Sequence, residues 1–156
     1  IKNEDSVKVM SLFELNEDGT DAHTHKGLTW GVYGIITNAT DINDGKANTE
    51  KLVALGSNYK AAVACSLYST EGTKQGDWYL PAHQELIDMQ WSTNSTAIQS
   101  SLNNLSTLAL SLDEDNHYWA SYENYGNYAS YLGTGNGTIY FDSKNTYNLV
   151  RAFCEI

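Results

Sequence analysis

The side chains best suited to chemistry in this sequence are tyrosine, asparagine and serine, and they gather near its end. Seven of the 11 tyrosines fall in the last quarter of the chain. Tyrosine offers a large amphipathic surface at low entropic cost, while Ser, Gly and Asn supply adaptable hydrogen bonds. The chemistry that this mixture predicts is noncovalent recognition of a ligand. The candidate ligand-binding residues are Tyr122, Asn124, Tyr125, Asn127, Tyr128, Ser130, Tyr131, Gly133, Gly135, Asn136, Tyr140, Asp142, Ser143 and Tyr147.

A tyrosine-rich β-sheet is the structural alternative for the same segment, because tyrosine favours strands. The tyrosines from Tyr122 to Tyr131 recur every three residues, whereas a half-buried strand requires a period of two. A helix would suit that period better, but Gly126, Gly133 and the asparagines disfavour one. Some of these side chains must therefore point outward or lie in loops, which keeps the binding role open.

The two cysteines and a pair of histidines are further candidates for chemistry. Cys65 and Cys154 lie in apolar runs, which favours structural roles over a reactive thiol, since such a thiol needs a polar activating neighbourhood. His23 and His25 could project from one face of a strand close to Asp21, but no Glu or Cys completes a metal site there. We therefore expect no metal at these histidines.

Arrangements typical of enzymes are missing from the sequence. Glu123 and Asp142 could be imagined as a carboxylate pair, but nothing in the sequence fixes their separation. The run 41–45 superficially resembles an EF-hand loop, but Leu52 stands where calcium requires a bidentate Glu. No nucleophile elbow, zinc-protease, dithiol or phosphate-loop motif occurs. We expect no enzymatic activity and no cofactor.

Composition limits the partners that the chain can bind. Its 156 residues fit one domain with its own core, so we expect a single domain over residues 1–156. The formal net charge of −10 argues against nucleic acid and against an anionic membrane surface. No apolar run approaches the roughly 20 residues of a spanning helix, so we expect no membrane insertion. Because the chain starts at Ile1 without Met, we interpret it as a domain cut from a longer or processed protein.

Hydrophobic periodicity and turn residues predict an α+β fold, with helices in the middle of the chain and strands on either side. Asn48 or Thr49 should cap the first helix and Ser95 the last, while Pro81 should lie in a first turn. The expected helices run over residues 48–56, 60–68, 81–90 and 95–108. The expected strands run over residues 7–15, 28–36, 78–80, 118–122, 129–132, 138–141 and 149–156.

Four motifs in order along the chain carry a resemblance to a known group of proteins. Residues 76–81 (GDWYLP), followed by Glu85-Leu86, resemble the D-W-[YF]-L-P-x-x-x-E-L element of bacterial surface and phage domains with a C-type-lectin fold. Residues 45–49 (GKANT) are similar to that group's helix start. Residues 118–123 (YWASYE) are similar to its Y-W-S-S-[TS]-E element, and residues 150–153 (VRAF) to its closing V-R-x-[VF].

The resemblance implies a C-type-lectin-type fold, with mixed β-sheets, two or more helices and termini in adjacent strands. It also implies which residues are structural. Cys65 and Cys154 resemble the pair that joins the first helical region to the last strand in lectin-type domains. They would form either a disulfide, in an oxidising compartment, or two adjacent buried thiols. The implied structural residues are Trp78, Leu80, Pro81, Trp119, Cys65 and Cys154.

Within that group, the end of the chain resembles the variable proteins of diversity-generating retroelements. In that family, adenine-directed mutagenesis places Asn, Tyr, Ser, Asp, Gly, Thr and Ile at scattered sites on a fixed scaffold. The candidate variable segment is 118–149. Two positions depart from the family pattern, since Ala120 replaces the usual serine and Leu149 a commoner Arg or Val. Within the segment, the residues that resemble the fixed scaffold are Trp119, Glu123, Ala129, Leu132, Gly137 and Lys144.

The implied function is display of a binding surface toward a protein or glycan receptor, from a bacterial cell surface or a phage virion. A homo-oligomer through a missing adjacent region is compatible with this role. One alternative is an adhesin or pilus-type structural domain of the same fold that is not diversified. Another is a formylglycine-generating-type enzyme, but Cys65 and Cys154 do not offer its paired active-site cysteines in sequence. Calcium-mediated sugar binding is disfavoured because Pro81 is the one proline and the E-P-N, Q-P-D and W-N-D elements are missing.

Overall fold

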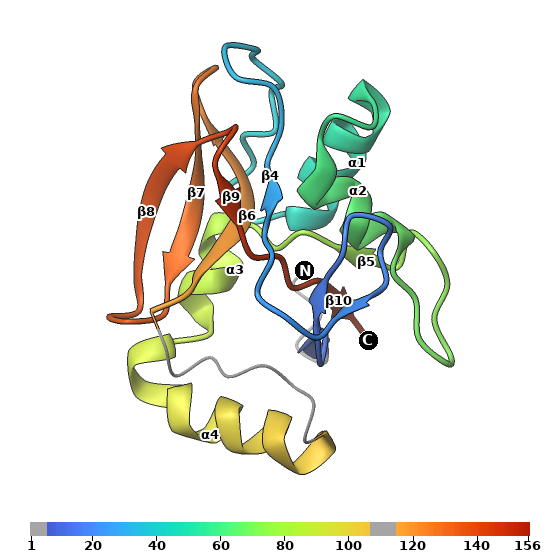
Figure 1. Cartoon of the computed structure of the whole chain (residues 1–156), viewed down its shortest axis with the longest axis vertical. Helices are drawn as coiled ribbons and strands as arrows, with labels where there is room; N and C mark the ends of the chain where they lie inside the picture. Colours follow the sequence, from blue (N-terminus) through green and yellow to red (C-terminus); the bar gives the residue numbers. More distant parts are fainter. Residues whose placement is uncertain (1–5, 107–114) are drawn as a thin grey trace.

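The computed structural model describes residues 6–106 and 115–156, which form an α+β fold (Figure 1). In Figure 1 the sheet of β6, β7 and β8 stands on one side of the molecule, α1 and α2 on the other, and α4 crosses the lower end. The helices are α1 (Gly45–Leu55), α2 (Lys60–Leu67), α3 (His83–Asp88) and α4 (Trp91–Leu105). The strands are β1 (Lys8–Met10), β2 (Glu14–Leu15), β3 (Asp21–Ala22), β4 (Leu28–Thr29), β5 (Trp78–Tyr79), β6 (His117–Asn124), β7 (Tyr128–Gly133), β8 (Thr138–Ser143), β9 (Tyr147–Asn148) and β10 (Phe153–Glu155).

The strands of the described residues pair into four small antiparallel sheets, ordered β1-β10-β5, β2-β3, β4-β9 and β6-β7-β8. In the first of these, Met10 pairs with Phe153 and Trp78 with Cys154. The first and last strands are therefore neighbours, as expected for the two ends of the chain. β6, β7 and β8 follow one another as a meander, and a bulge between Trp119 and Glu123 interrupts the pairing of β6 with β7.

The segment from Trp78 to Pro81 ties the central helices to β6. Trp78 and Leu80 are buried in the core beside α1 and α2. The backbone amide of Leu80 donates to the Thr49 hydroxyl at 3.0 Å, and the carbonyl of Pro81 accepts from the amide of Ser121 at 2.8 Å. A strand, a helix and the long sheet thus meet at this short motif.

Two tryptophans form the centre of the main core, and both are fully buried. The indole N–H of Trp30 donates to the carbonyl of Ala120 at 2.8 Å. The indole N–H of Trp119 donates in return to the carbonyl of Leu28 at 2.8 Å. Burying two large aromatic side chains with both N–H groups satisfied stabilises the contact between the β4 segment and β6 without a polar penalty.

Two of the predicted helix starts are wrong. The first helix begins at Gly45, and the N-cap is Asp44, whose carboxylate accepts from the amide of Ala47 at 2.8 Å. Asn48 and Thr49 lie inside that helix and are buried, since their side chains make tertiary hydrogen bonds instead. The last helix begins at Trp91 rather than near Ser95. Its predicted last apolar residue, Leu108, lies outside the described residues.

Other predicted boundaries differ more mildly. Pro81 precedes α3, which runs over His83–Asp88, instead of lying in its first turn. The predicted strand 7–15 divides into β1 and β2, and the closing strand is only Phe153–Glu155.

The predicted strand over 28–36 is the largest error of the expected fold. Only Leu28–Thr29 is a strand, and Val32, Tyr33, Ile35 and Ile36 are exposed. The run looked like a buried strand because it is apolar, but Gly34 has a φ of 86°, which breaks the extended path. An apolar run alone does not distinguish a buried strand from a loop that other segments hold at the surface.

Cys65 in α2 and Cys154 in β10 are both free and both buried, so of the two alternatives left open by the sequence the structure has buried thiols rather than a disulfide. Burial raises the pKa of both thiols, which disfavours the reactive thiolate. The described part of the chain has no helix that is long and apolar enough to cross a membrane.

We expect Trp119→Ala to lower the free energy of unfolding by about 3–5 kcal/mol, because it removes a fully buried aromatic side chain. Urea unfolding measures the change. Tyr125→Ala is the control, since Tyr125 is 81% exposed and its loss should leave stability nearly unchanged. Similar losses for the two variants would contradict the division between scaffold and surface.

We expect a thiol reagent to leave Cys65 and Cys154 unlabelled in the native protein, because both are buried with raised pKa values. After unfolding in urea without reductant, both thiols should react. Mass spectrometry after labelling counts them. An unfolded chain that takes up no label would instead establish a bridge.

Candidate ligand-binding surface

The sheet of β6, β7 and β8 divides the candidate residues between its two faces. Paired residues of antiparallel strands lie on the same face, and successive residues alternate. Trp119 pairs with Tyr131, and Tyr131 with Tyr140, so these three share one face. Tyr118, Leu132 and their neighbour Ile139 lie on the opposite face, where they pack with Trp91 of α4. The tyrosines therefore do not form one continuous surface.

On the first face, aromatic rings form what we call the aromatic row: His117, Trp119, Tyr131 and Tyr140. The ring of Tyr131 lies 4.5 Å from that of His117 and 5.8 Å from that of Tyr140. The amide of Asn136 donates to the Tyr140 hydroxyl at 2.7 Å, which holds this exposed ring in place. A ring that is fixed before a ligand arrives loses little conformational entropy on binding.

The second face carries a smaller cluster around His83 of α3. Its imidazole lies 5.4 Å from the ring of Tyr122 and stacks on Phe141 at 6.1 Å. Burial lowers the pKa of His83, so the ring is neutral at neutral pH, and its buried Nδ1 has no hydrogen-bond partner among the described residues. Tyr128 and Phe141 on the same face are about half exposed. Phe141 and His83 were not predicted, because neither belongs to the Tyr/Asn/Ser/Gly pattern.

The turn between β6 and β7 makes Tyr125 the most exposed of the candidate tyrosines. Its φ of 58° is left-handed, and its side chain is 81% exposed. The next residue, Gly126, lies against the backbone of Gly34, where a Cβ would come within 3.0 Å of the Gly34 carbonyl oxygen. The absence of a side chain at Gly126 therefore allows the turn to touch the loop that precedes α1.

Two of the candidate residues are buried in the structure. Ser130 is fully buried, and its hydroxyl faces the carbonyl of Tyr122. Gly133 is buried under the ring of Tyr140. Both belong to β7, the central strand of the sheet, where neighbouring strands and side chains cover them. Composition could not separate these inward positions from the outward ones.

Some of the remaining Gly, Asn, Asp and Ser candidates are exposed to solvent, and others make hydrogen bonds within the domain. Gly135 and Asn136 are exposed, while Asn124 and Asn127 are partly exposed. Asp142 accepts hydrogen bonds from Thr146 and Asn148 and so helps to shape the turn before β9. Ser143 donates to Asn145 in the same turn.

Tyr147 lies apart from the sheet, on β9, and is 69% exposed. It borders an open hollow of about 710 Å³ that Asn16, Glu17 and Lys26 also line. These three residues come from the first part of the chain, and the composition of the last segment could not have predicted them.

A buried ion pair, Glu123 with Lys144, underlies the turn of β6 and β7. The ammonium of Lys144 lies 2.8 Å from the Glu123 carboxylate, and both side chains are almost wholly inaccessible. The same carboxylate accepts from the backbone amide and the hydroxyl of Thr37, at 2.9 Å and 2.6 Å. Lys144 also donates to the carbonyl of Ile35 and lies 4.8 Å from the centre of the Trp30 ring.

Burial alone would raise the pKa of the Glu123 carboxyl, but the hydrogen bonds from Lys144 and Thr37 outweigh it and lower that pKa. Glu123 is therefore ionised and engaged. Asp142 has its own partners, so the imagined pair of Glu123 with Asp142 for acid–base work is not supported. Within 6–106 and 115–156, no group of three or more His, Cys, Asp or Glu side chains is arranged to hold a metal ion. His25 instead lies 2.8 Å from the buried carboxylate of Glu14.

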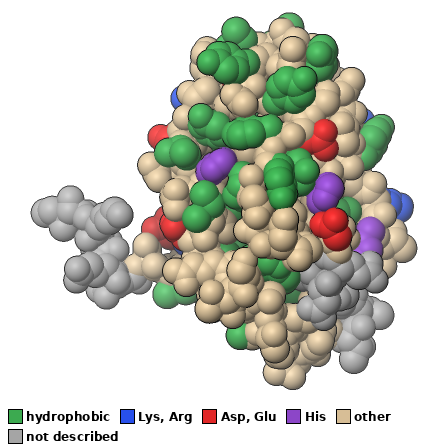
Figure 2. All heavy atoms as spheres, turned by 90° about the vertical axis from the view of Figure 1, so that its left-hand side faces the viewer, with side chains coloured by type: hydrophobic (Ala, Val, Ile, Leu, Met, Phe, Trp, Pro, Cys, Tyr) green, Lys and Arg blue, Asp and Glu red, His purple; other side chains and the backbone are tan. Residues whose placement is uncertain are grey.

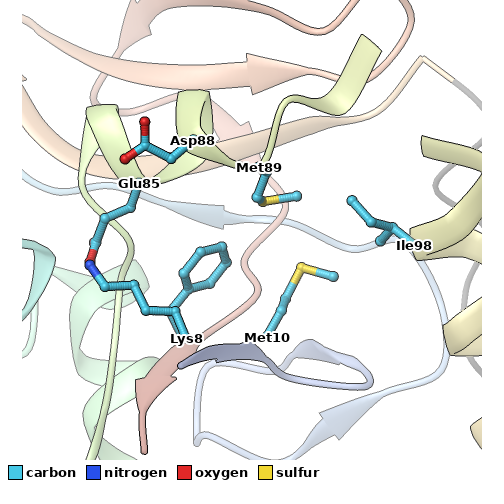
Figure 3. A pocket seen from close by; sticks show the side chains of 7 residues that line it. Lys8, Met10, Glu85, Asp88, Met89 and Ile98 are labelled. Atoms are coloured by element: carbon cyan, nitrogen blue, oxygen red, sulfur yellow. The ribbon is translucent and has the colours of Figure 1, made fainter. Parts of the chain in front are cut away.

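A separate apolar hollow of about 360 Å³ lies where β1 and β10 face α3 and α4 (Figure 3). Figure 3 shows Met10, Met89 and Ile98 directed toward one another, with the Lys8–Glu85 ion pair to one side. None of the candidate ligand-binding residues lines this hollow. It is distinct from the surface that the sequence predicts.

Comparison with known proteins adds no assignment. No protein-family model matches the chain, and no curated protein matches it either.

We expect Lys144→Met to lower the free energy of unfolding by about 3–5 kcal/mol, because it leaves the Glu123 carboxylate buried without a partner. Urea unfolding measures this loss. Lys60→Met is the matched control: its ion pair with Glu17 is exposed to solvent, and its loss should lower the free energy of unfolding far less. Equal costs for the two variants would mean that the buried pair has no special role.

The same pair predicts how stability depends on pH. Since the folded pKa of Glu123 is lowered, its contribution is complete above the ordinary carboxyl pKa and is lost as pH falls through the lowered value. The free energy of unfolding should therefore drop more for the natural protein than for Glu123→Gln between neutral pH and about pH 3. Parallel curves for the two proteins would contradict the prediction.

Proposed function

We propose that this chain is a ligand-binding display domain of the C-type-lectin type, whose segment 118–149 is diversified by a retroelement. It binds a protein or glycan on a surface and is itself displayed on a bacterial cell or a phage virion. Binding is by complementarity, with tyrosine rings as anchors and Asn, Asp and Gly positions as adaptable polar contacts.

The observation that carries the proposal is the alternation of buried and exposed residues along the segment. Five residues that resemble the family's fixed scaffold are almost completely buried: Trp119, Glu123, Ala129, Leu132 and Lys144. Between them, Tyr125, Tyr128, Tyr140 and Tyr147 are exposed at 81%, 45%, 42% and 69%. Changes at the exposed positions can alter recognition without disturbing the core, which is what a diversified surface needs.

The arrangement of the ends of the chain supports the lectin-type fold within this proposal. β1 and β10 pair with each other, and β10 also pairs with β5, which carries the start of the W-Y-L-P element. Small sheets with helices packed beside them are compatible with that fold. These features support the family assignment.

An adhesin or structural domain without diversification is the second candidate, and one observation favours it. Several candidate residues make fixed contacts within the domain: Asn136 holds Tyr140, and Asp142 binds Asn148 and Thr146. Random substitution at these positions would change the shape of the surface as well as its chemistry. An unchanging surface would benefit more from such contacts.

Deep sequencing of the last third of the gene, across a growing population of its source, separates these two functions. We expect substitutions at adenine-containing codons of Tyr125, Tyr128, Tyr140 and Tyr147, with Trp119 and Leu132 unchanged. Ser130 and Gly133 should be spared or rarely accepted because they are buried. A segment that never varies would overturn diversification and favour the fixed adhesin.

A further inference from the structure

A second exposed surface lies outside the candidate variable segment, in the loop between β4 and α1. Val32, Tyr33, Ile35 and Ile36 are exposed there, with Ile36 at 66%. Figure 1 shows this loop projecting beside the turn of β6 and β7 at the upper end of the molecule, and Figure 2 shows hydrophobic side chains gathered at that end. Clustered exposed apolar side chains on a soluble domain mark an interaction site.

The backbone of this loop is held firmly, although its side chains point to solvent. Gly31 donates to the carbonyl of Lys144 at 3.1 Å, and Gly34 donates to the carbonyl of Gly126 at 2.9 Å. The Ile35 carbonyl of the loop accepts a hydrogen bond from the ammonium of Lys144, and the Thr37 amide donates one to the buried carboxylate of Glu123. The apolar side chains are therefore presented in a fixed arrangement, which lowers the entropic cost of binding.

The loop is continuous with the proposed ligand-binding surface. The contact of Gly34 with Gly126 brings it against the turn that projects Tyr125. We call Val32, Tyr33, Ile35, Ile36 and Tyr125 together the apolar tip. Neither segment 28–37 nor segment 124–128 contains a charged residue. The charges beneath the tip, on Glu123 and Lys144, are buried and neutralise each other.

We propose that the apolar tip enters an apolar hollow on a protein partner, as a fixed contact beside the variable ones. This inference rests on the proposed function, because the partner is the receptor that segment 118–149 binds. It narrows that receptor to a protein, since isoleucine and valine side chains offer a sugar's hydroxyl groups no hydrogen-bond partner.

Charge disfavours two other binding partners for the apolar tip, an anionic membrane and a second copy of the chain. An anionic membrane would require basic residues, and the two segments that form the tip have none. A second copy of the chain would bring together two domains that each carry a net charge of −10. A neutral apolar surface on a different protein meets neither obstacle.

A matched pair of isoleucine variants tests the inference. Ile36→Asp places a charge in the tip, while Ile156→Asp places the same charge at a residue of the same type and nearly equal exposure, 69%. Thermal unfolding should be similar for both variants and the natural protein, because both side chains are exposed. A phage-displayed random peptide library, selected on the natural domain, supplies the probe.

We expect the selected peptides to be rich in aromatic and aliphatic residues. Ile36→Asp should weaken their binding about tenfold or more, as loss of an interface anchor does, and Ile156→Asp should leave it unchanged. Three results would overturn the inference: equal binding by both variants, capture of phosphatidylcholine vesicles by the tip, or a dimer in light scattering that Ile36→Asp dissociates. Binding only to a glycan array, insensitive to Ile36→Asp, would overturn it as well.

Tyr140→Ser separates failure of the inference from failure of the proposed function. If Tyr140→Ser weakens peptide binding and Ile36→Asp does not, the sheet remains the proposed ligand-binding surface, and the apolar tip is not part of the binding site. Binding that neither substitution weakens contradicts both proposals.

Discussion

The ion pair of Glu123 with Lys144 is the contact on which the binding end of this domain depends, because it joins three segments that have no regular pairing with one another. Glu123 lies on β6, Lys144 follows β8, and both bind the backbone of the loop before α1. Removing two charges from water costs several kcal/mol, and the pair recovers this only because Thr37, the Ile35 carbonyl and the Trp30 ring complete its surroundings. Apolar residues could stabilise the same volume, but they could not bind a loop backbone at a defined position.

This constraint explains which features were predictable from the sequence. The helix from Lys60, the W-Y strand and the three strands of the long sheet follow from local patterns, and each occurs close to its expected range. The loop at 31–37 does not, because its conformation is decided by Lys144 and Glu123, which lie far away in the sequence. The prediction of Asn48 as a helix cap failed for a similar reason. Its side chain is suited to capping, but it donates a hydrogen bond to the hydroxyl of Ser121, which is distant in the sequence.

The candidate site shows the same division between local and distant causes. Composition identified the segment that carries the exposed tyrosines, since residue type reflects the chemistry of recognition. It could not identify which of them share a face, because composition does not give the register in which β6, β7 and β8 pair. Residues from elsewhere, such as His83 and Gly34, became neighbours of the segment only through folding.

The location of Lys144 within the segment has a consequence at the level of the gene. Both codons for lysine begin with two adenines, the base that the proposed mutagenesis alters. A buried cation that organises the binding end would then be encoded by the bases most exposed to change. Any copy in which this codon changed would lose the ammonium and, with it, the fold of the binding end. The number of folded variants would thus depend on how often the Lys144 codon is copied unchanged, as well as on the number of surface positions that vary.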